Sequence, residues 1–278
     1  MDDLVSLAVE HVRRRSDGAP MPPGLAVTLN FHPDTPSPDG TMIEQLAREG
    51  VYRSQFETRT SNGGLTAYPG GDRWRWESRL FGGAYDDDHG AVVEMRPKYG
   101  ALNYLDRPHG GSHRFGSCHL RLNPGVLGRT TFCYPDSFMT PERFGTADRM
   151  ALIALAVANE AALDLLDDYI EAHVHGRLSV ADDVAAIVLD PSYRGTTIET
   201  AARSLPCAVE WHDGFRLPRE RLADCERYRG PDAARTLEAL EVDGFLTPAD
   251  IGQARRNGLD YQLAKWAWHC VARFGAAS

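Results

Sequence analysis

The middle of the chain decides the fold and opens with Gly50-Val-Tyr-Arg-Ser-Gln-Phe-Glu-Thr-Arg-Thr-Ser-Asn-Gly-Gly-Leu-Thr-Ala. Polar and glycine residues stay dense to about residue 137, and two later blocks read Arg96-Pro-Lys-Tyr-Gly-Ala-Leu-Asn and Phe115-Gly-Ser-Cys-His-Leu-Arg-Leu. Glycine lets the backbone approach a ligand closely, and Arg, Tyr, Ser and Asn supply directed hydrogen bonds. This stretch therefore predicts short strands and loops that build a binding site.

The residues before this stretch predict regular elements. We expect a helix over residues 2–15, then a Pro/Gly-rich linker that cannot be helical, then a strand over 25–32. Thr41, with Glu44 three residues later, matches a capping box and predicts a helix that ends at Gly50.

Two further stretches are expected to contribute to the core. Asp72-Arg-Trp-Arg-Trp-Glu-Ser-Arg alternates as a strand would, with Trp74 and Trp76 on its buried face. Residues 146–167 are rich in Ala and Leu and predict a buried helix.

The second half of the chain predicts two strands and a helical tail. The strands are expected over 169–175 and 184–190, where Pro191 ends the second. The helices are expected over 196–204, 218–228, 231–242, 247–256 and 258–274. This order is typical of an α+β fold. We divide it into an N-terminal helix and linker (1–22), one α+β domain (23–215) and a helical C-terminal extension (216–278).

Composition excludes several classes of protein. The 278 residues, 42% of them hydrophobic, can bury a substantial core, and the net charge of −9 disfavours a broad nucleic-acid or anionic-membrane surface. A local basic groove stays possible within that charge. The five widely spaced cysteines indicate neither a disulfide framework nor a zinc ribbon. We expect no membrane span and a cytoplasmic protein, with export without a signal peptide left open.

Three ionisable side chains alternate along the strand expected at 169–175. Glu171, His173 and His175 share one face, which is either exposed to solvent or the wall of a site. A fixed carboxylate in a water-poor pocket stabilises a cationic sugar centre. Glu171 is therefore a candidate catalytic residue.

Other candidate residues lie at strand ends and in the polar tract. His32, in Asn30-Phe-His-Pro-Asp, ends the first strand, and Tyr99 precedes a glycine that allows its ring to face a flat ligand. The tract offers hydroxyl, amide and guanidinium groups for a phosphate or ribose. Its candidate cofactor-binding residues are Arg53, Ser54, Gln55, Thr58, Ser61 and Asn62. The glycine patterns of P-loop and Rossmann sites are absent.

At these blocks the chain resembles the DUF3626 family of uncharacterised bacterial proteins, over about residues 25–215. The shared blocks look like His32-Pro-Asp, Tyr52-Arg-Ser-Gln-Phe-Glu-Thr with Ser61-Asn-Gly-Gly, Arg96-Pro-Lys-Tyr-Gly-Ala-Leu-Asn and Arg114-Phe-Gly-Ser. Such a family name supplies no activity.

A more distant similarity is to the ADP-ribosyltransferase toxin superfamily, and it implies an ADP-ribosyltransferase-like β-rich core. That similarity assigns His32 to NAD ribose or phosphate, the middle elements with Tyr99 to nicotinamide, and Glu171 to the nicotinamide ribose and the oxocarbenium ion. His173 stands where the superfamily carries Glu or Gln, which leaves both transfer to an acceptor and hydrolysis of NAD open.

The leading hypothesis is an enzyme that cleaves the nicotinamide–ribose bond of NAD and transfers ADP-ribose to an unknown acceptor, a macromolecule or a small molecule. It assigns no metal ligands. One alternative is a metal-dependent hydrolase in which His173 and His175 bind an ion with His32 or His119. The other is a binding protein without catalysis, which an exposed Glu171 would favour.

Overall fold

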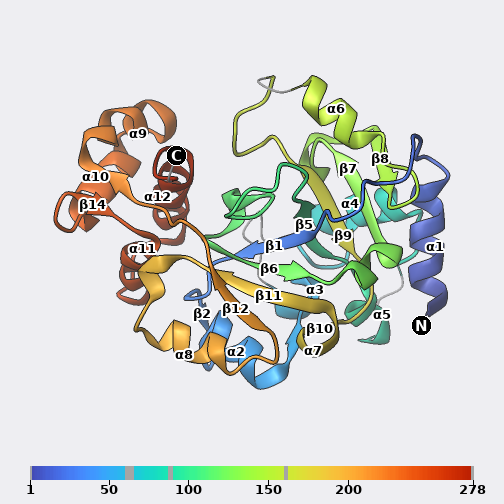
Figure 1. Cartoon of the computed structure of the whole chain (residues 1–278), viewed down its shortest axis with the longest axis horizontal. Coiled ribbons are helices and arrows are strands. Elements are labelled where there is room, and N and C mark those ends of the chain that lie inside the picture. The colour runs from blue at the N-terminus through green and yellow to red at the C-terminus, as the bar shows by residue number, and fades with distance from the viewer. Residues whose placement is uncertain (1, 60–65, 87–89, 160–161, 277–278) are drawn as a thin grey trace. The chain divides into compact units, whose positions relative to one another are not determined.

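The computed structural model describes residues 2–59, 66–86, 90–159 and 162–276, and its chain divides into two compact units (Figure 1). Unit 1 comprises Met1–Leu29, Val51–Ser112 and Arg121–Ala185, and unit 2 comprises Asn30–Gly50, His113–Leu120 and Ala186–Ser278. Each unit therefore collects segments that are far apart in sequence. Both contain helices and strands, so the fold is mixed, which is compatible with the expected α+β class.

Unit 1 carries most of the strands. Its strands are β1 (Val27–Phe31, which continues into unit 2), β4 (Val51–Tyr52), β5 (Lys98–Leu102), β7 (Thr130–Tyr134), β8 (Arg143–Thr146), β9 (Ile170–Val174) and β10 (Leu178–Ser179). Its helices are α1 (Asp2–Arg13), α3 (Gln55–Thr58), α4 (Asp72–Phe81), α5 (Gly90–Met95), α6 (Leu152–Ala158) and α7 (Val180–Asp183), with 3₁₀ helices at Pro124–Arg129 and Ser137–Met139. The expected first helix, first strand and Glu171 strand are all present.

The strands of unit 1 form an antiparallel array in the order β1-β5-β9-β7-β8. All five residues of β9 are buried, so this strand is covered on both faces. A hydrophobic cluster against the array joins α1 and α4 to β7 and β8. Its buried members are Ala8, Val12, Leu80, Phe81, Tyr85, Val92, Met95, Cys133 and Phe144.

Unit 2 combines short strands with most of the C-terminal helices. Its strands are β2 (Pro36–Ser37), β3 (Gly40–Thr41), β6 (Cys118–Leu122), β11 (Val184–Leu189), β12 (Ala208–Trp211), β13 (Leu217–Pro218) and β14 (Phe245–Leu246), and the unit boundary falls within β6 and β11. Its helices are α2 (Met42–Glu49), α8 (Thr197–Arg203), α9 (Leu222–Arg229), α10 (Pro231–Leu240), α11 (Pro248–Arg256) and α12 (Tyr261–Phe274), with 3₁₀ helices at His113–Phe115, Pro191–Tyr193 and Arg219–Arg221. β11 and β12 pair in parallel, and α9, α10 and α12 pack together in orange and red in Figure 1.

The capping box predicted for α2 and the predicted C-terminal helices are confirmed in unit 2. Glu44 accepts hydrogen bonds from both the backbone and the hydroxyl of Thr41, each at 2.8 Å, and Gly50 ends α2 in the left-handed conformation. All five expected helices between residues 196 and 274 are present. The strands β12, β13 and β14 were not predicted, because runs of two to four residues carry too little periodicity.

Two expectations for unit 1 were wrong. The stretch expected to form a strand with Trp74 and Trp76 is the helix α4, and both tryptophans are half-buried. Residues 146–167 were expected to form one buried helix, but α6 covers only Leu152–Ala158 and Val157 is 53% exposed. High helix propensity therefore predicted neither the length nor the burial of that segment.

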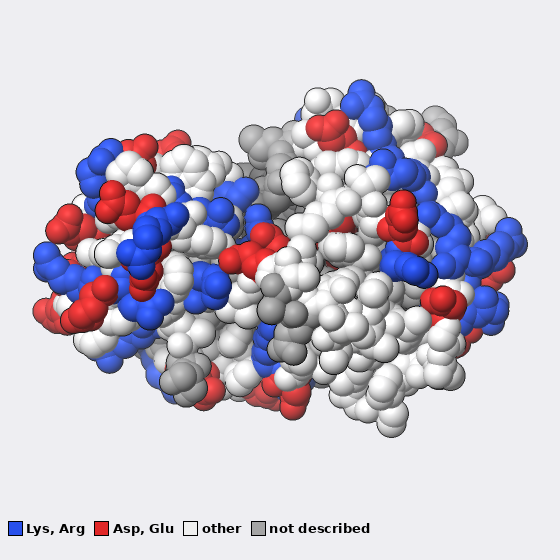
Figure 2. All heavy atoms as spheres, turned by 90° about the horizontal axis from the view of Figure 1, so that it is seen from above, with Lys and Arg blue, Asp and Glu red and all other residues white. Residues whose placement is uncertain are grey.

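Charge is unevenly spread on the surface of unit 1. On the face shown in Figure 2, Lys and Arg side chains gather at the right-hand end, where α1 lies in Figure 1, and α1 leads into Arg13-Arg14-Arg15. A local basic area thus exists within an acidic chain. Among the helices of the described residues, none is long and apolar enough to cross a membrane.

Candidate functional site

The register of three neighbouring strands collects polar side chains on one face of the array in unit 1. On β5 and β9, Tyr99 lies opposite His173, and on β7 and β9, Thr131 lies opposite His173 and Cys133 opposite Glu171. Side chains two residues apart on a strand share a face, so these five groups point to the same side. The face is the one on which α4 packs.

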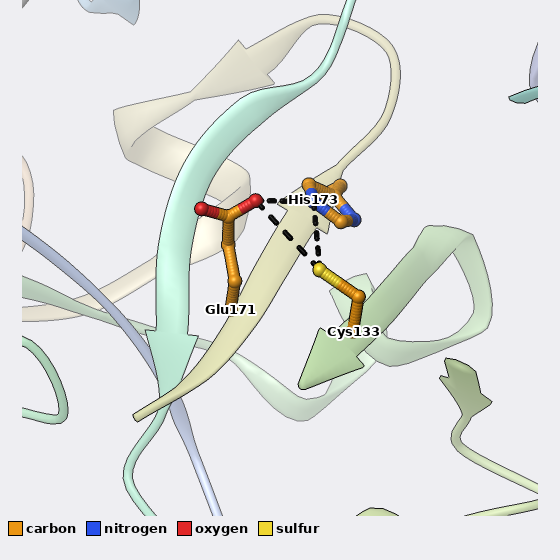
Figure 3. A group of neighbouring side chains, drawn as sticks. All are labelled: Cys133, Glu171 and His173. Carbon is orange, nitrogen blue, oxygen red and sulfur yellow. Dashed lines mark hydrogen bonds and ion pairs between the residues drawn. The ribbon is translucent and has the colours of Figure 1, made fainter. Parts of the chain in front are cut away.

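Glu171 is at the centre of this group and is 6% exposed. Its Oε1 atom lies 2.8 Å from Nε2 of His173 and accepts a hydrogen bond from the backbone N–H of Ser137 at 3.3 Å. The Sγ atom of Cys133 lies 3.9 Å from both Oε1 and Nε2. Figure 3 shows the glutamate and the histidine projecting from β9 toward the cysteine on β7. Among the described residues, every hydrogen bond to this carboxylate falls on Oε1, which leaves Oε2 uncommitted.

A chain of hydrogen bonds continues from His173 into the interior. Thr131 Oγ1 lies 3.2 Å from Nδ1 of His173 and 2.9 Å from Nε2 of His175, and the Tyr85 hydroxyl lies 2.9 Å from Nδ1 of His175. Phe81 meets both imidazoles edge to face, with ring centroids 5.2 and 4.8 Å away. One consistent set of donors runs from Tyr85 through His175, Thr131 and His173 to Oε1 of Glu171, so every ring nitrogen of the two buried histidines has a hydrogen-bond partner.

Helix α4 supplies the charges that surround the group. Arg73 donates to Ser137 Oγ at 3.4 Å and its guanidinium lies 4.4 Å from the centroid of the Tyr99 ring. Glu77 accepts from the Tyr99 hydroxyl at 2.9 Å and pairs with Arg96 at 2.7 Å, with both charged side chains 1% exposed. The tyrosine is thereby fixed through its hydroxyl and through one face of its ring.

Lys98 holds backbone segments together beside this site. The ammonium of Lys98 donates to the carbonyls of Glu94, Arg96 and Gly176 at 2.6, 3.1 and 2.8 Å. Burial lowers the pKa of this lysine to about 8, although the carboxylate of Glu57, 4.0 Å away, favours the charged form. Lys98 therefore joins two backbone segments next to the site, residues 94–96 and the turn at Gly176.

The surroundings of Glu171 favour its charged form. Burial alone would raise its pKa, but the hydrogen bond from His173, the charge of Arg73 and the N–H of Ser137 outweigh it and lower the pKa. For the Cys133 thiol the balance is opposite, because burial and the nearby Glu171 raise its pKa well above the ordinary value. A buried neutral thiol is a poor nucleophile, so the cysteine does not fit a nucleophilic role.

The structure brings together some of the residues predicted from sequence. Glu171 and Tyr99 meet in this group, and the exposed glutamate that would favour a binding protein is not observed. His32 lies in unit 2, where its ring contacts Trp268 at 4.8 Å between centroids and where burial and then Arg255 lower its pKa to about 4. For the alternative metal set, both ring nitrogens of His175 already have partners.

The described part of the polar tract of unit 1 forms the short helix α3. Its expected ligand residues were Arg53, Ser54, Gln55, Thr58, Ser61 and Asn62, of which Ser61 and Asn62 lie outside the described residues. Ser54 is buried as the N-cap of α3, where its hydroxyl accepts from the N–H of Glu57 and that carboxylate accepts from the N–H of Ser54. Gln55 and Thr58 begin and end α3, and the exposed Arg53 lies 3.8 Å from Glu57.

Sequence reasoning missed Arg73, Glu77, Thr131 and Cys133. The signal for α4 was available, because Arg73, Glu77, Leu80 and Phe81 follow the spacing of one helix face. The tryptophan alternation hid it. Nothing in the isolated sequence of β7 marks Thr131 and Cys133, since their position beside Glu171 depends on strand register.

The fold and this buried group define a protein of mixed helices and strands with a cluster of ionisable side chains on the antiparallel array of unit 1. A family model described as "Protein of unknown function (DUF3626)" matches residues 26–164 and 157–273, so the chain belongs to that family. The expected family is confirmed, and the match extends into the C-terminal helices. No curated protein matches the chain. Similarity to the ADP-ribosyltransferases gains no support from these comparisons and stays a prediction.

Proposed function

We propose that the chain is an NAD-consuming enzyme of the ADP-ribosyltransferase type, with Glu171 as its catalytic carboxylate. The observation that carries the proposal is the state of this side chain: it is nearly closed to water, it is held through Oε1 by His173 and Ser137, and its Oε2 atom has no hydrogen bond to any residue that the structure describes. A carboxylate fixed in this way meets a developing cation without having to reorganise.

The arrangement of strands also supports the proposal. The superfamily distributes its NAD-binding residues over a first strand, a middle strand and a later strand with the catalytic Glu. Here β1 pairs with β5, which carries Tyr99, and β5 pairs with β9, which carries Glu171. The three strands thus lie next to one another in the array of unit 1, in the same order as in the superfamily's pattern.

In the proposed reaction the bond between ribose C1′ and the nicotinamide nitrogen breaks, and its electron pair stays on nicotinamide. The positive charge moves to the ribose as an oxocarbenium ion, which Oε2 of Glu171 stabilises by charge. The acceptor, or water, then attacks C1′ and loses its proton. Tyr99, held in place by Arg73 and Glu77, would stack on nicotinamide.

The other predicted NAD contacts remain proposals. His32 would bind the adenosine side, and Arg53, Ser54, Gln55, Thr58, Ser61 and Asn62 would line the NAD site. The capping role of Ser54 leaves it less free than the rest. The acceptor is not assigned.

The test is release of nicotinamide from NAD by the full chain, compared with Glu171→Gln. The amide keeps the shape and can still accept from His173, so the fold is preserved and only the charge is lost. We expect turnover to fall by about 100-fold or more while NAD binding survives. Glu142→Gln, an exposed glutamate of the same unit, is the matched control and should keep full activity. An unaffected rate in Glu171→Gln would remove the assignment.

A further inference from the structure

Three donor atoms of different chemistry meet in the core of unit 1: Sγ of Cys133, Oε1 of Glu171 and Nε2 of His173 (Figure 3). All three residues are buried, and the donor atoms lie within 4.8 Å of one another. They come from paired positions of β7 and β9, so the backbone fixes their spacing. Thiolate, imidazole and carboxylate together are typical ligands of zinc.

The separations fit one ion without movement of the strands. Oε1 and Nε2 are 2.8 Å apart, and Sγ is 3.9 Å from each. An ion placed about 2.05 Å from the oxygen and the nitrogen, and about 0.5 Å out of the plane of the three atoms, lies about 2.3 Å from the sulfur, which are the usual zinc distances. The ion would replace the proton that now bridges the carboxylate and the imidazole.

The hydrogen-bond chain behind His173 is a second observation that favours zinc at these three donor atoms. A histidine that binds metal through Nε2 must carry its proton on Nδ1, and an acceptor there fixes the ring. Thr131 Oγ1 lies 3.2 Å from that nitrogen and can pass its own hydrogen to Nε2 of His175, 2.9 Å away. His175 then carries its proton on Nδ1, toward the Tyr85 hydroxyl at 2.9 Å.

We propose that Cys133, Glu171 and His173 form a zinc-binding site with one coordination position left open. On binding, the Cys133 thiol releases its proton to solvent and its sulfur bonds to the metal, while the proton of His173 Nε2 is relocated to Nδ1. Nothing is oxidised or reduced. The charge of Arg73, which acts on Glu171, opposes a cation here and weakens its binding. The site shares Glu171 with the proposed function but does not depend on it, because metal binding is read without NAD.

The experiment uses the full chain, freed of metal by a chelator and titrated with Co²⁺ as a spectroscopic substitute for Zn²⁺. We expect one equivalent of Co²⁺ to produce a thiolate-to-cobalt charge-transfer band, which one equivalent of Zn²⁺ abolishes. Cys133→Ser, which nearly keeps the volume of the side chain, should lose that band, and so should His173→Gln. Cys207→Ala, at a half-buried cysteine of unit 2, should keep it.

A second variant reads the positioning role of Thr131. Thr131→Val removes the hydroxyl and should weaken Zn²⁺ binding by about 10- to 100-fold. Thr131→Ser keeps the hydroxyl and should bind Zn²⁺ as tightly as the wild type. Circular dichroism confirms that each variant is folded. A folded wild-type chain that binds no Co²⁺ would overturn the proposal, as would a band that survives in Cys133→Ser or is lost in Cys207→Ala. A wild-type chain that binds Co²⁺ but releases no nicotinamide from NAD would reject the proposed function and leave the metal site standing.

Discussion

Asp34 in unit 2 gives the clearest prediction of pH-dependent stability. It is 3% exposed, and burial raises its pKa from the ordinary 3.8 to about 6, against the opposing effects of the Tyr193 hydroxyl and of Arg256. The guanidinium of Arg256 is 3.6 Å from Oδ2, and the buried Tyr193 hydroxyl and Cys118 thiol are titratable neighbours. The folded protein thus favours the protonated acid.

The sign follows from which state holds the proton. Between pH 3.8 and about 6 the folded protein keeps the Asp34 proton and the unfolded chain has lost it, so the unfolding free energy falls as pH rises. The stabilisation is complete below pH 3.8 and lost above about pH 6. The difference between the two pKa values corresponds to about 3 kcal/mol.

The perturbation is Asp34→Asn, which keeps the shape and cannot ionise. His32, whose pKa is lowered to about 4, changes stability in the opposite direction over the same range, so only the difference between the two proteins is informative. Urea unfolding followed by circular dichroism should show the variant gaining about 2 kcal/mol on the wild type between about pH 4 and about pH 7. A difference that does not change across this range would refute the reasoning.

Three other predictions concern stability. Glu77→Gln removes the negative charge that compensates the buried Arg96 guanidinium and should cost about 3–5 kcal/mol in urea unfolding; a loss below about 1 kcal/mol would mean that the pair is not buried in solution. Ser54→Ala removes the cap of α3 and should cost about 1 kcal/mol, whereas a raised KM for NAD at unchanged stability would instead indicate a ligand contact. Gly116→Ala would place a methyl group 2.0 Å from a backbone carbon of the neighbouring strand and should lower the melting temperature, whereas Gly125→Ala meets nothing within 4 Å and should not; equal melting temperatures would contradict this packing.

Local chemistry explains which parts of the fold were predictable. Thr41 and Glu44 specify the start of α2 by themselves, whereas the last helix, expected over 258–274, begins at Tyr261 after its N-cap Asp260. By contrast, β9 alternates polar and apolar residues although it is covered on both faces, so the alternation did not predict its full burial. The rule that polar residues of a strand face solvent fails here, because the buried polar side chains of β9 have partners on distant parts of the chain.

The candidate site was predictable only in part for a related reason. Glu171 and Tyr99 were visible because their blocks are locally unusual. Arg73 contacts them only because α4 packs on the array, and Cys133 only because of the register of β7. Contacts of this kind are set by tertiary structure, which no short pattern in the chain records.

The most direct test of the central claim is the identity of the products formed from NAD by the metal-free wild-type chain, separated by chromatography and identified by mass spectrometry. The account predicts free nicotinamide together with either free ADP-ribose, from attack by water, or ADP-ribose attached to an added acceptor. The Glu171→Gln variant should form none of these products. Intact NAD would contradict it. Cleavage at the pyrophosphate, with release of AMP and nicotinamide mononucleotide, would contradict it equally.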